Sequence, residues 1–111
     1  MASELSRKTC VPCKGGVAAY SGDEARRMMD QLDGWLLSGD ATGISRRFEF
    51  KGFAKAVEMA NLAAWLGNKQ GHHPDIAFGW GYCEVRFTTH EAGGLTENDF
   101  ICAARLDALL A

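Results

Sequence analysis

The chain has 111 residues, a formal net charge of −2 at pH 7 and 47% hydrophobic residues, a composition typical of one folded domain with a modest core. The small net charge argues against a nucleic-acid-binding protein, and no apolar run reaches the roughly 18 residues that a membrane span needs. We therefore expect a single domain over residues 1–111 that binds neither nucleic acid directly nor a membrane.

Residues 1–21 are expected to form an extended arm, because "PCKGG" is rich in turn-forming residues. The arm lacks the apolar core of a secretory signal, so we expect a cytoplasmic protein with reduced thiols, an organelle being the alternative. Cys10 and Cys13 form a CxxC, but no second CxxC completes a zinc site. A thiol pair without catalytic consequence is favoured over a metal or redox site.

The first helix is predicted to start after Ser21 or Asp23 and to stop at Gly34, with its apolar residues at helical spacing. These residues are Met28, Met29 and Leu32. Next, "WLLSGDATGISRRFEF" predicts two short strands joined by the turn "SGDATG". Ile44, Arg46, Phe48 and Phe50 alternate onto the face expected to pack against helices.

A long helix is predicted over residues 52–70, with Gly67 and Gly71 ending it. Its expected core stripe is broad enough that a partner subunit could cover part of it. The stripe consists of Phe53, Val57, Ala60 and Ala64, widened by Met59, Leu62 and Leu66.

Two strands and a helix complete the predicted order. Residues 76–78 and 82–90 read as strands, the second with Cys83, Val85 and Phe87 on one side. The last helix follows Thr96 as its N-cap. The order helix, two strands, helix, two strands, helix predicts a two-layer α+β fold, with a four-stranded antiparallel sheet and three helices on one face.

The three histidines of the chain are His72 and His73, in "GHHPD", and His90, in "TTHE". They could serve acid–base chemistry, hold a metal, or satisfy backbone groups structurally. Neighbouring histidines on an extended loop point in opposing directions, which disfavours a metal. Both segments end secondary-structure elements, where functional sites gather, and Trp80 could offer a flat face to a ring-shaped ligand. We therefore expect His90 to meet the pair around a small planar heterocycle.

The segment "HHPDIAFGWGYCEVRFTTHEAGGLTENDF" resembles the signature of the pterin-4a-carbinolamine dehydratases. The residues that carry the resemblance are His72, His73, Pro74, Trp80, Thr89, His90, Gly94, Leu95, Thr96 and Asp99. The runs "FEFKGFAKA" and "CVPCKGGV" extend it over nearly the whole chain. The resemblance implies four antiparallel strands with three helices on one side, in dimers or tetramers.

The implied reaction is loss of water from 4a-hydroxytetrahydropterin, which recycles the pterin cofactor of aromatic amino-acid hydroxylases and needs no metal or organic cofactor of its own. Its expected catalytic residues are His72, His73 and His90. The expected substrate-binding residues are Gly71, His72, His73, Trp80, Thr88, Thr89, His90 and Glu91.

Two residues could orient a histidine. Asp99 could do so, or could only favour a helix N-terminus. Asn68 stands where the family often has a glutamate, so the charge that could raise the basicity of an imidazole is missing there. The alternative function is non-catalytic, either a dimerisation cofactor or an assembly or regulatory protein that uses helix surfaces. Met28, Met29 and Met59 could belong to such a surface, although core packing is the commoner use of methionine.

Overall fold

The computed structural model describes residues 4–12 and 17–110. Its elements are η1 (Leu5–Arg7), α1 (Gly22–Met29), β1 (Leu36–Leu37), β2 (Ile44–Glu49), α2 (Ala54–Gln70), β3 (Asp75–Gly79), β4 (Tyr82–Phe87), η2 (His90–Ala92) and α3 (Glu97–Leu110). The strands pair antiparallel in the order β1-β2-β4-β3. The predicted element order and the α+β class are therefore confirmed.

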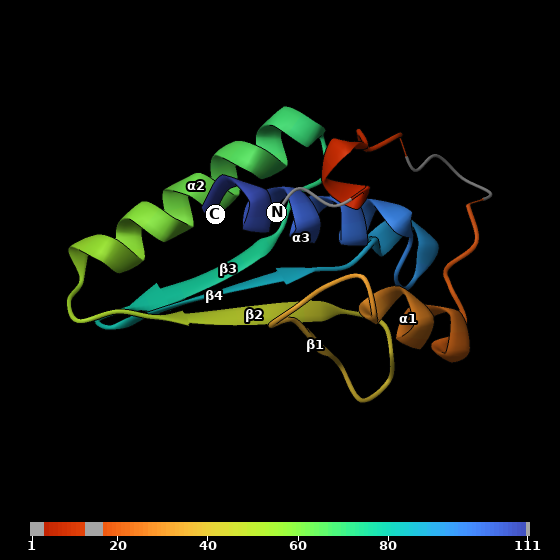
Figure 1. The fold of residues 1–111 in the computed structure, drawn as a ribbon, viewed down its shortest axis with the longest axis horizontal. Coiled ribbons are helices and arrows are strands. Elements are labelled where there is room, and N and C mark those ends of the chain that lie inside the picture. Colours follow the sequence, from red (N-terminus) through yellow and green to blue (C-terminus); the bar gives the residue numbers. More distant parts are fainter. Residues whose placement is uncertain (1–3, 13–16, 111) are drawn as a thin grey trace.

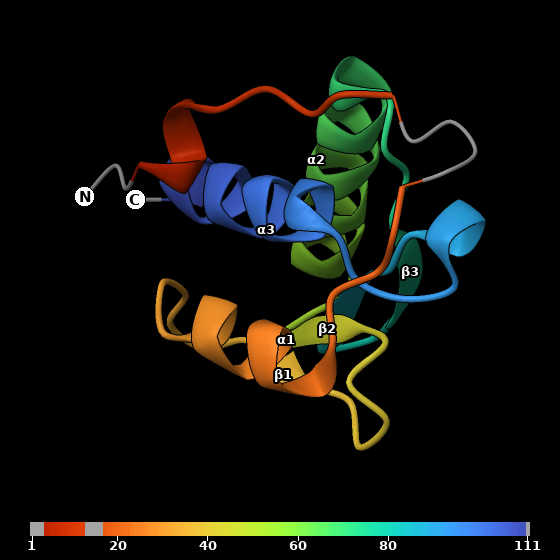
Figure 2. The same ribbon diagram turned by 90° about the vertical axis from the view of Figure 1, so that its right-hand side faces the viewer.

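Helices α2 and α3 lie over one face of the sheet, and α1 lies beside β1 (Figure 1). Seen in the turned view, α3 and α2 lie above β1 and β2, and β3 lies beside α2 (Figure 2). The predicted alternation in β4 is confirmed, because Cys83, Val85 and Phe87 are fully buried beneath the helices. Residues from the three α-helices that the described segments contain join one core with this strand face.

Helix α1 begins where the sequence predicts. The Ser21 side chain accepts a hydrogen bond from the backbone of Glu24, and the Glu24 side chain accepts one from the backbone of Ser21. This reciprocal pair satisfies two donors that a helix start leaves unpaired. The helix ends at Met29, before the predicted stop at Gly34, because the next residues switch to shorter-range turns. Met28 and Met29 pack against the core, as Met59 of α2 does, and do not form an exposed methionine surface.

The core stripe of α2 is rotated from the predicted one. The prediction that Phe53 and Ala64 face the core is wrong, since both are exposed. The buried positions follow each other three or four residues apart, the spacing of one helix face. They are Ala56, Met59, Ala60, Ala63, Leu66 and Gly67.

Gly67 does not end α2, which corrects the prediction. It lies inside the helix, and a Cβ atom there would overlap Cδ of Pro74. The missing side chain therefore lets the helix lie against the turn that follows it. Gly71 ends the helix as predicted, in the left-handed conformation at φ 67° that glycine adopts without strain.

The N-terminal arm lies along α3, which Figure 2 shows as the chain passing over that helix. Leu5 is 2% exposed, and the Arg105 guanidinium donates hydrogen bonds to the carbonyls of Ser6 and Lys8. The predicted extended arm thus includes one helical turn, η1, held by α3. In the described ranges, no helix is both long and apolar enough to cross a bilayer.

Candidate active site

Two connections meet at one end of the β3–β4 hairpin. His72 and His73 precede β3, and Thr88, Thr89 and His90 follow β4. Because β3 and β4 pair antiparallel, the start of one strand lies beside the end of the other. A cavity of about 140 Å³ opens there. It is lined by Val11, Gly71, His72, His73, Thr88, His90, Glu91 and Asn98. The expected meeting of His90 with the histidine pair is therefore observed.

His72 is the buried member of the pair, with 9% of its surface exposed. Its Nε2 lies 2.6 Å from Oδ1 of Asp99, and its ring stacks on Phe87 with 6.3 Å between ring centres. Since a carboxylate only accepts hydrogen bonds, Nε2 carries the proton in this contact. Within the described residues, Nδ1 is then the ring nitrogen left to exchange a proton with a ligand.

Asp99 is fully buried at the start of α3, and the residues around it hold its carboxylate in place. Its Oδ2 accepts hydrogen bonds from the Thr89 hydroxyl at 2.8 Å and from the Thr96 backbone amide at 2.9 Å. The hydroxyls of Thr89 and Thr96 also lie 2.9 Å apart. One carboxylate thus both closes the first turn of the helix and orients an imidazole.

Two opposing effects act on the pKa of His72. Burial lowers it, because a charged ring loses its hydration. The hydrogen bond and the charge of Asp99 raise it, and together with weaker contributions they prevail, so the pKa lies above its ordinary value of 6.5. The ring is therefore a stronger base than a free imidazole.

The solvent side of the cavity carries three exposed titratable side chains, which belong to His73, His90 and Glu91. His73 is exposed, whereas its neighbour His72 is buried. The Thr88 hydroxyl donates to the carbonyl of Thr42, which fixes the rotamer of that side chain at the cavity wall. The cavity thus has imidazole and carboxylate groups on its open side and one oriented imidazole inside.

Four predicted site residues lie outside this lining, and one of them, Asp99, is the buried partner of His72 described above. Trp80 is 72% exposed in the β3–β4 turn, which is the opposite end of the hairpin. Five strand residues at about 3.3 Å each separate the two ends. Thr89 is buried behind the cavity against Asp99, and Asn68 is exposed on the last turn of α2. The structure therefore does not place the Trp80 ring, the Thr89 side chain or Asn68 at the cavity.

Sequence reasoning missed Val11 and Asn98. The Asn98 side chain donates to the carbonyl of Val11 at 2.6 Å and accepts from its amide at 3.1 Å. This pairing brings the arm to the cavity wall. No local pattern could reveal it, because the two residues are 87 positions apart.

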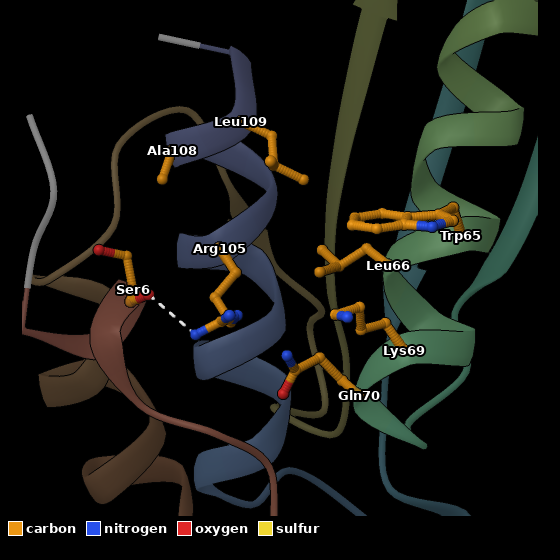
Figure 3. A pocket seen from close by; sticks show the side chains of 8 residues that line it. All are labelled: Ser6, Trp65, Leu66, Lys69, Gln70, Arg105, Ala108 and Leu109. Carbon is orange, nitrogen blue, oxygen red and sulfur yellow. Dashed lines mark hydrogen bonds between the residues drawn. The ribbon is translucent and has the colours of Figure 1, made fainter.

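A second hollow, of about 150 Å³, lies between α2 and α3 (Figure 3). Trp65 and Leu66 of α2 face Leu109 of α3, and the Arg105 side chain lies over α3 with its guanidinium bonded to the carbonyl of Ser6. It offers no imidazole, so the histidine-lined cavity is the candidate active site. The described ranges contain no group of three or more His, Cys, Asp or Glu side chains arranged to hold a metal ion.

The fold and the cavity define an α+β protein with a histidine site at the ends of two antiparallel strands. Residues 18–109 match the family described as Pterin 4 alpha carbinolamine dehydratase, and the chain belongs to that family. A relative from Paracoccus denitrificans is 52% identical and covers 84% of this chain and 87% of its own length. One from Halorhodospira halophila is 49% identical, with coverages of 95% and 96%. Both carry the name "Putative pterin-4-alpha-carbinolamine dehydratase".

Two solved structures are similar. The transcriptional coactivator/pterin dehydratase from Brucella melitensis superposes with a TM-score of 0.75 at 29% identity, over 84% of this chain and 99% of that one. A pterin dehydratase-like protein identified as a RuBisCO assembly factor in the alpha-carboxysome gives a TM-score of 0.57 at 29% identity, over 69% and 89%. The fold thus occurs in proteins with different described roles.

Proposed function

We propose that this protein dehydrates 4a-hydroxytetrahydropterin to quinonoid dihydropterin and water, which recycles the cofactor of aromatic amino-acid hydroxylases. The observation that carries the proposal is one cavity lined by His72, His73 and His90, in which the buried carboxylate of Asp99 orients His72. Membership of the family supports the same reaction.

The reaction needs two proton transfers. The bond between C4a and the hydroxyl oxygen breaks, and that oxygen leaves as water after it receives a proton. A proton leaves a ring nitrogen, and its electron pair forms the new carbon–nitrogen double bond. His72 suits the second transfer, because Asp99 stabilises the imidazolium that forms when Nδ1 takes up a proton. His90 then delivers the proton to the departing hydroxyl.

His73 binds and orients the pterin from the open side of the cavity in this proposal. The edge of a pterin presents hydrogen-bond donors and acceptors. Glu91 can accept from its amino group, and the backbone at Gly71 and Thr88 can contact the ring. Thr89 contributes indirectly, since its hydroxyl holds Asp99. The protons move between imidazoles and substrate, so the proposal includes no metal or organic cofactor, and dialysis against EDTA should leave turnover unchanged.

The test is an assay of the purified protein with freshly generated 4a-hydroxytetrahydropterin. His72→Ala and His90→Ala should each lower kcat by about 10²–10⁴-fold, the usual contribution of general acid–base catalysis. His73→Ala should act mainly on KM. Asn68→Ala is the matched control from the end of the preceding helix, and it should keep wild-type turnover because its side chain is exposed outside the cavity. Wild-type rates in both His72→Ala and His90→Ala, with folding intact by circular dichroism, would refute the proposal.

A partner-binding role is the second candidate, and exposed aromatic residues favour it. Phe53 is 51% exposed and contacts Phe78, which is 44% exposed on β3, while Trp80 is 72% exposed nearby in the sequence. Surfaces of this kind are commonly covered by another chain. A homodimer or homotetramer would cover them with copies of this chain, and a different protein could use a helix surface. Light scattering on the purified protein distinguishes a monomer from the homodimer and the homotetramer.

A further inference from the structure

The N-terminal arm is fastened to the rest of the molecule by contacts on both sides of Cys10. Before it, Arg105 holds the carbonyls of Ser6 and Lys8, and Figure 3 shows the dashed contact to Ser6. At Cys10 itself, the backbone amide donates to Oε1 of Gln70 at 3.0 Å. After it, Asn98 pairs with the backbone of Val11. The arm therefore presents the Cys10 side chain to α3 in a defined position.

The partner that Cys10 meets on α3 is a second thiol. Its Sγ lies 3.4 Å from Sγ of Cys102, a residue 92 positions away in the sequence. Closing this contact to the length of a disulfide, about 2.0 Å, needs a shift of little more than one ångström. The dehydration chemistry uses neither thiol.

The two thiols differ in exposure and in acidity. Cys102 is fully buried, whereas Cys10 is half-buried at the surface. The pKa of Cys10 is lowered, chiefly by the hydrogen bond between the two sulfurs, and the same contact raises the pKa of Cys102. A more acidic thiol at the accessible position and a buried thiol behind it match an attacking and a resolving cysteine.

We propose that Cys10 and Cys102 form a reversible oxidation site, at which a peroxide converts the pair into a disulfide that fastens the arm to α3. The inference rests on the contact between the two sulfurs and on the clamped arm. It is independent of the dehydratase activity.

The chemistry proceeds in two steps. The Cys10 thiolate attacks one peroxide oxygen, the O–O bond breaks, and the departing hydroxide takes up a proton to become water. Cys10 is then a sulfenic acid. Sγ of Cys102 next attacks the Cys10 sulfur, the S–S bond forms as the S–O bond breaks, and the second water leaves with the proton of Cys102. The two thiols lose two electrons and two protons, and the peroxide is reduced to two waters. An added dithiol reverses the change by disulfide exchange.

Oxidation of the two thiols should affect the candidate active site, because both cysteines lie next to residues that line its cavity. Val11, next to Cys10, lines the cavity, and Sγ of Cys102 lies 4.0 Å from the carbonyl oxygen of His72. A disulfide would hold Val11 against Asn98 and so restrict the opening of that wall. Backbone amides of the arm should therefore exchange hydrogen more slowly in the oxidised protein.

The experiment uses the full chain with Cys13→Ser and Cys83→Ser, which leaves Cys10 and Cys102 as the remaining thiols. Treatment with stoichiometric hydrogen peroxide should remove both thiols, lower the intact mass by two hydrogens and give a Cys10–Cys102 cross-link on peptide mapping. Dithiothreitol should restore both thiols. Amide exchange at Cys10 and Val11 should slow on the order of tenfold after oxidation. The wild-type chain should give the same cross-link.

Single-cysteine variants in that background identify the role of each sulfur. With Cys102→Ala, Cys10 should stop at the sulfenic acid and be trapped by dimedone. With Cys10→Ser, the buried Cys102 should stay reduced under the same treatment. If Cys102→Ala fails to fold, Cys10→Ser still tests whether Cys10 is the sulfur that the peroxide attacks. A Cys10–Cys13 or intermolecular disulfide in the wild-type chain, unchanged thiols, or unchanged amide exchange in the arm would each overturn the proposal.

Discussion

Replacing Asp99 with asparagine tests whether one buried carboxylate sets the protonation of His72. Asparagine keeps the shape of aspartate but replaces one oxygen with an NH₂ group. If its carbonyl oxygen keeps the bonds from Thr89 and Thr96, the NH₂ group faces Nε2 of His72. Nε2 must then accept a hydrogen bond, so the proton of the neutral ring moves to Nδ1. Nδ1 then already carries a hydrogen, so it can no longer take up a proton from the substrate.

Two magnitudes follow from this geometry. We expect kcat to fall by about 10²–10⁴-fold, because the ring no longer acts as a general base. Stability should fall by about 1–3 kcal/mol, since hydrogen bonds to a charged acceptor become bonds to a neutral one. The substitution thus separates the loss of a charge from the loss of packing volume.

The pH dependence has a definite sign. The folded-state pKa of His72 lies above 6.5, so protonation of this ring stabilises the fold. That stabilisation is complete below about pH 6.5 and is lost as the pH rises through the folded-state pKa. In Asp99→Asn no carboxylate raises the pKa of His72, so burial of the ring lowers this pKa. The stability difference between wild type and variant should therefore be largest in mildly acidic solution.

The assays are urea denaturation at a series of pH values, pterin turnover, and the ¹⁵N chemical shifts of the His72 ring. Glu97→Gln is the matched control, because it removes an exposed carboxylate from the same helical turn. That carboxylate pairs with Lys8 at 2.8 Å on the surface, where solvent screens the interaction, so the control should keep nearly wild-type stability. Wild-type turnover and an unchanged pH dependence in Asp99→Asn would refute the role assigned to Asp99.

Three further predictions follow from contacts elsewhere in the fold. Gly67→Ala should destabilise by about 1–3 kcal/mol in denaturant titrations, because its Cβ would meet Pro74, although alanine normally favours a helix; a gain in stability would contradict this close approach. Trp35→Phe removes the indole N–H that donates to Asp107 at 2.9 Å, and thermal unfolding should show a loss of about 1–2 kcal/mol. The Asp40 carboxyl should titrate near pH 2 by ¹³C NMR, because neighbouring hydroxyls lower its pKa to about 2; a midpoint near 4 would count against those hydrogen bonds.

Much of the fold follows from local patterns that act over a few residues. The capping box of Ser21 and Glu24 starts α1, and the alternation of β4 decides which of its side chains are buried. His72 and His73 before one strand and His90 after the next already indicate that they meet, because antiparallel neighbours share an end. Such features depend on short-range geometry, which the sequence by itself determines.

Tertiary packing decided the rest. Gly67 reads as a helix stop, but the approach of Pro74 keeps it inside α2. Trp80 is close to the histidines in sequence, yet a full strand length separates it from them. The contacts of Val11 with Asn98 and of Cys10 with Cys102 join residues about ninety positions apart. A local pattern cannot encode such pairs, because their atoms meet only after the arm, the helices and the sheet have packed together.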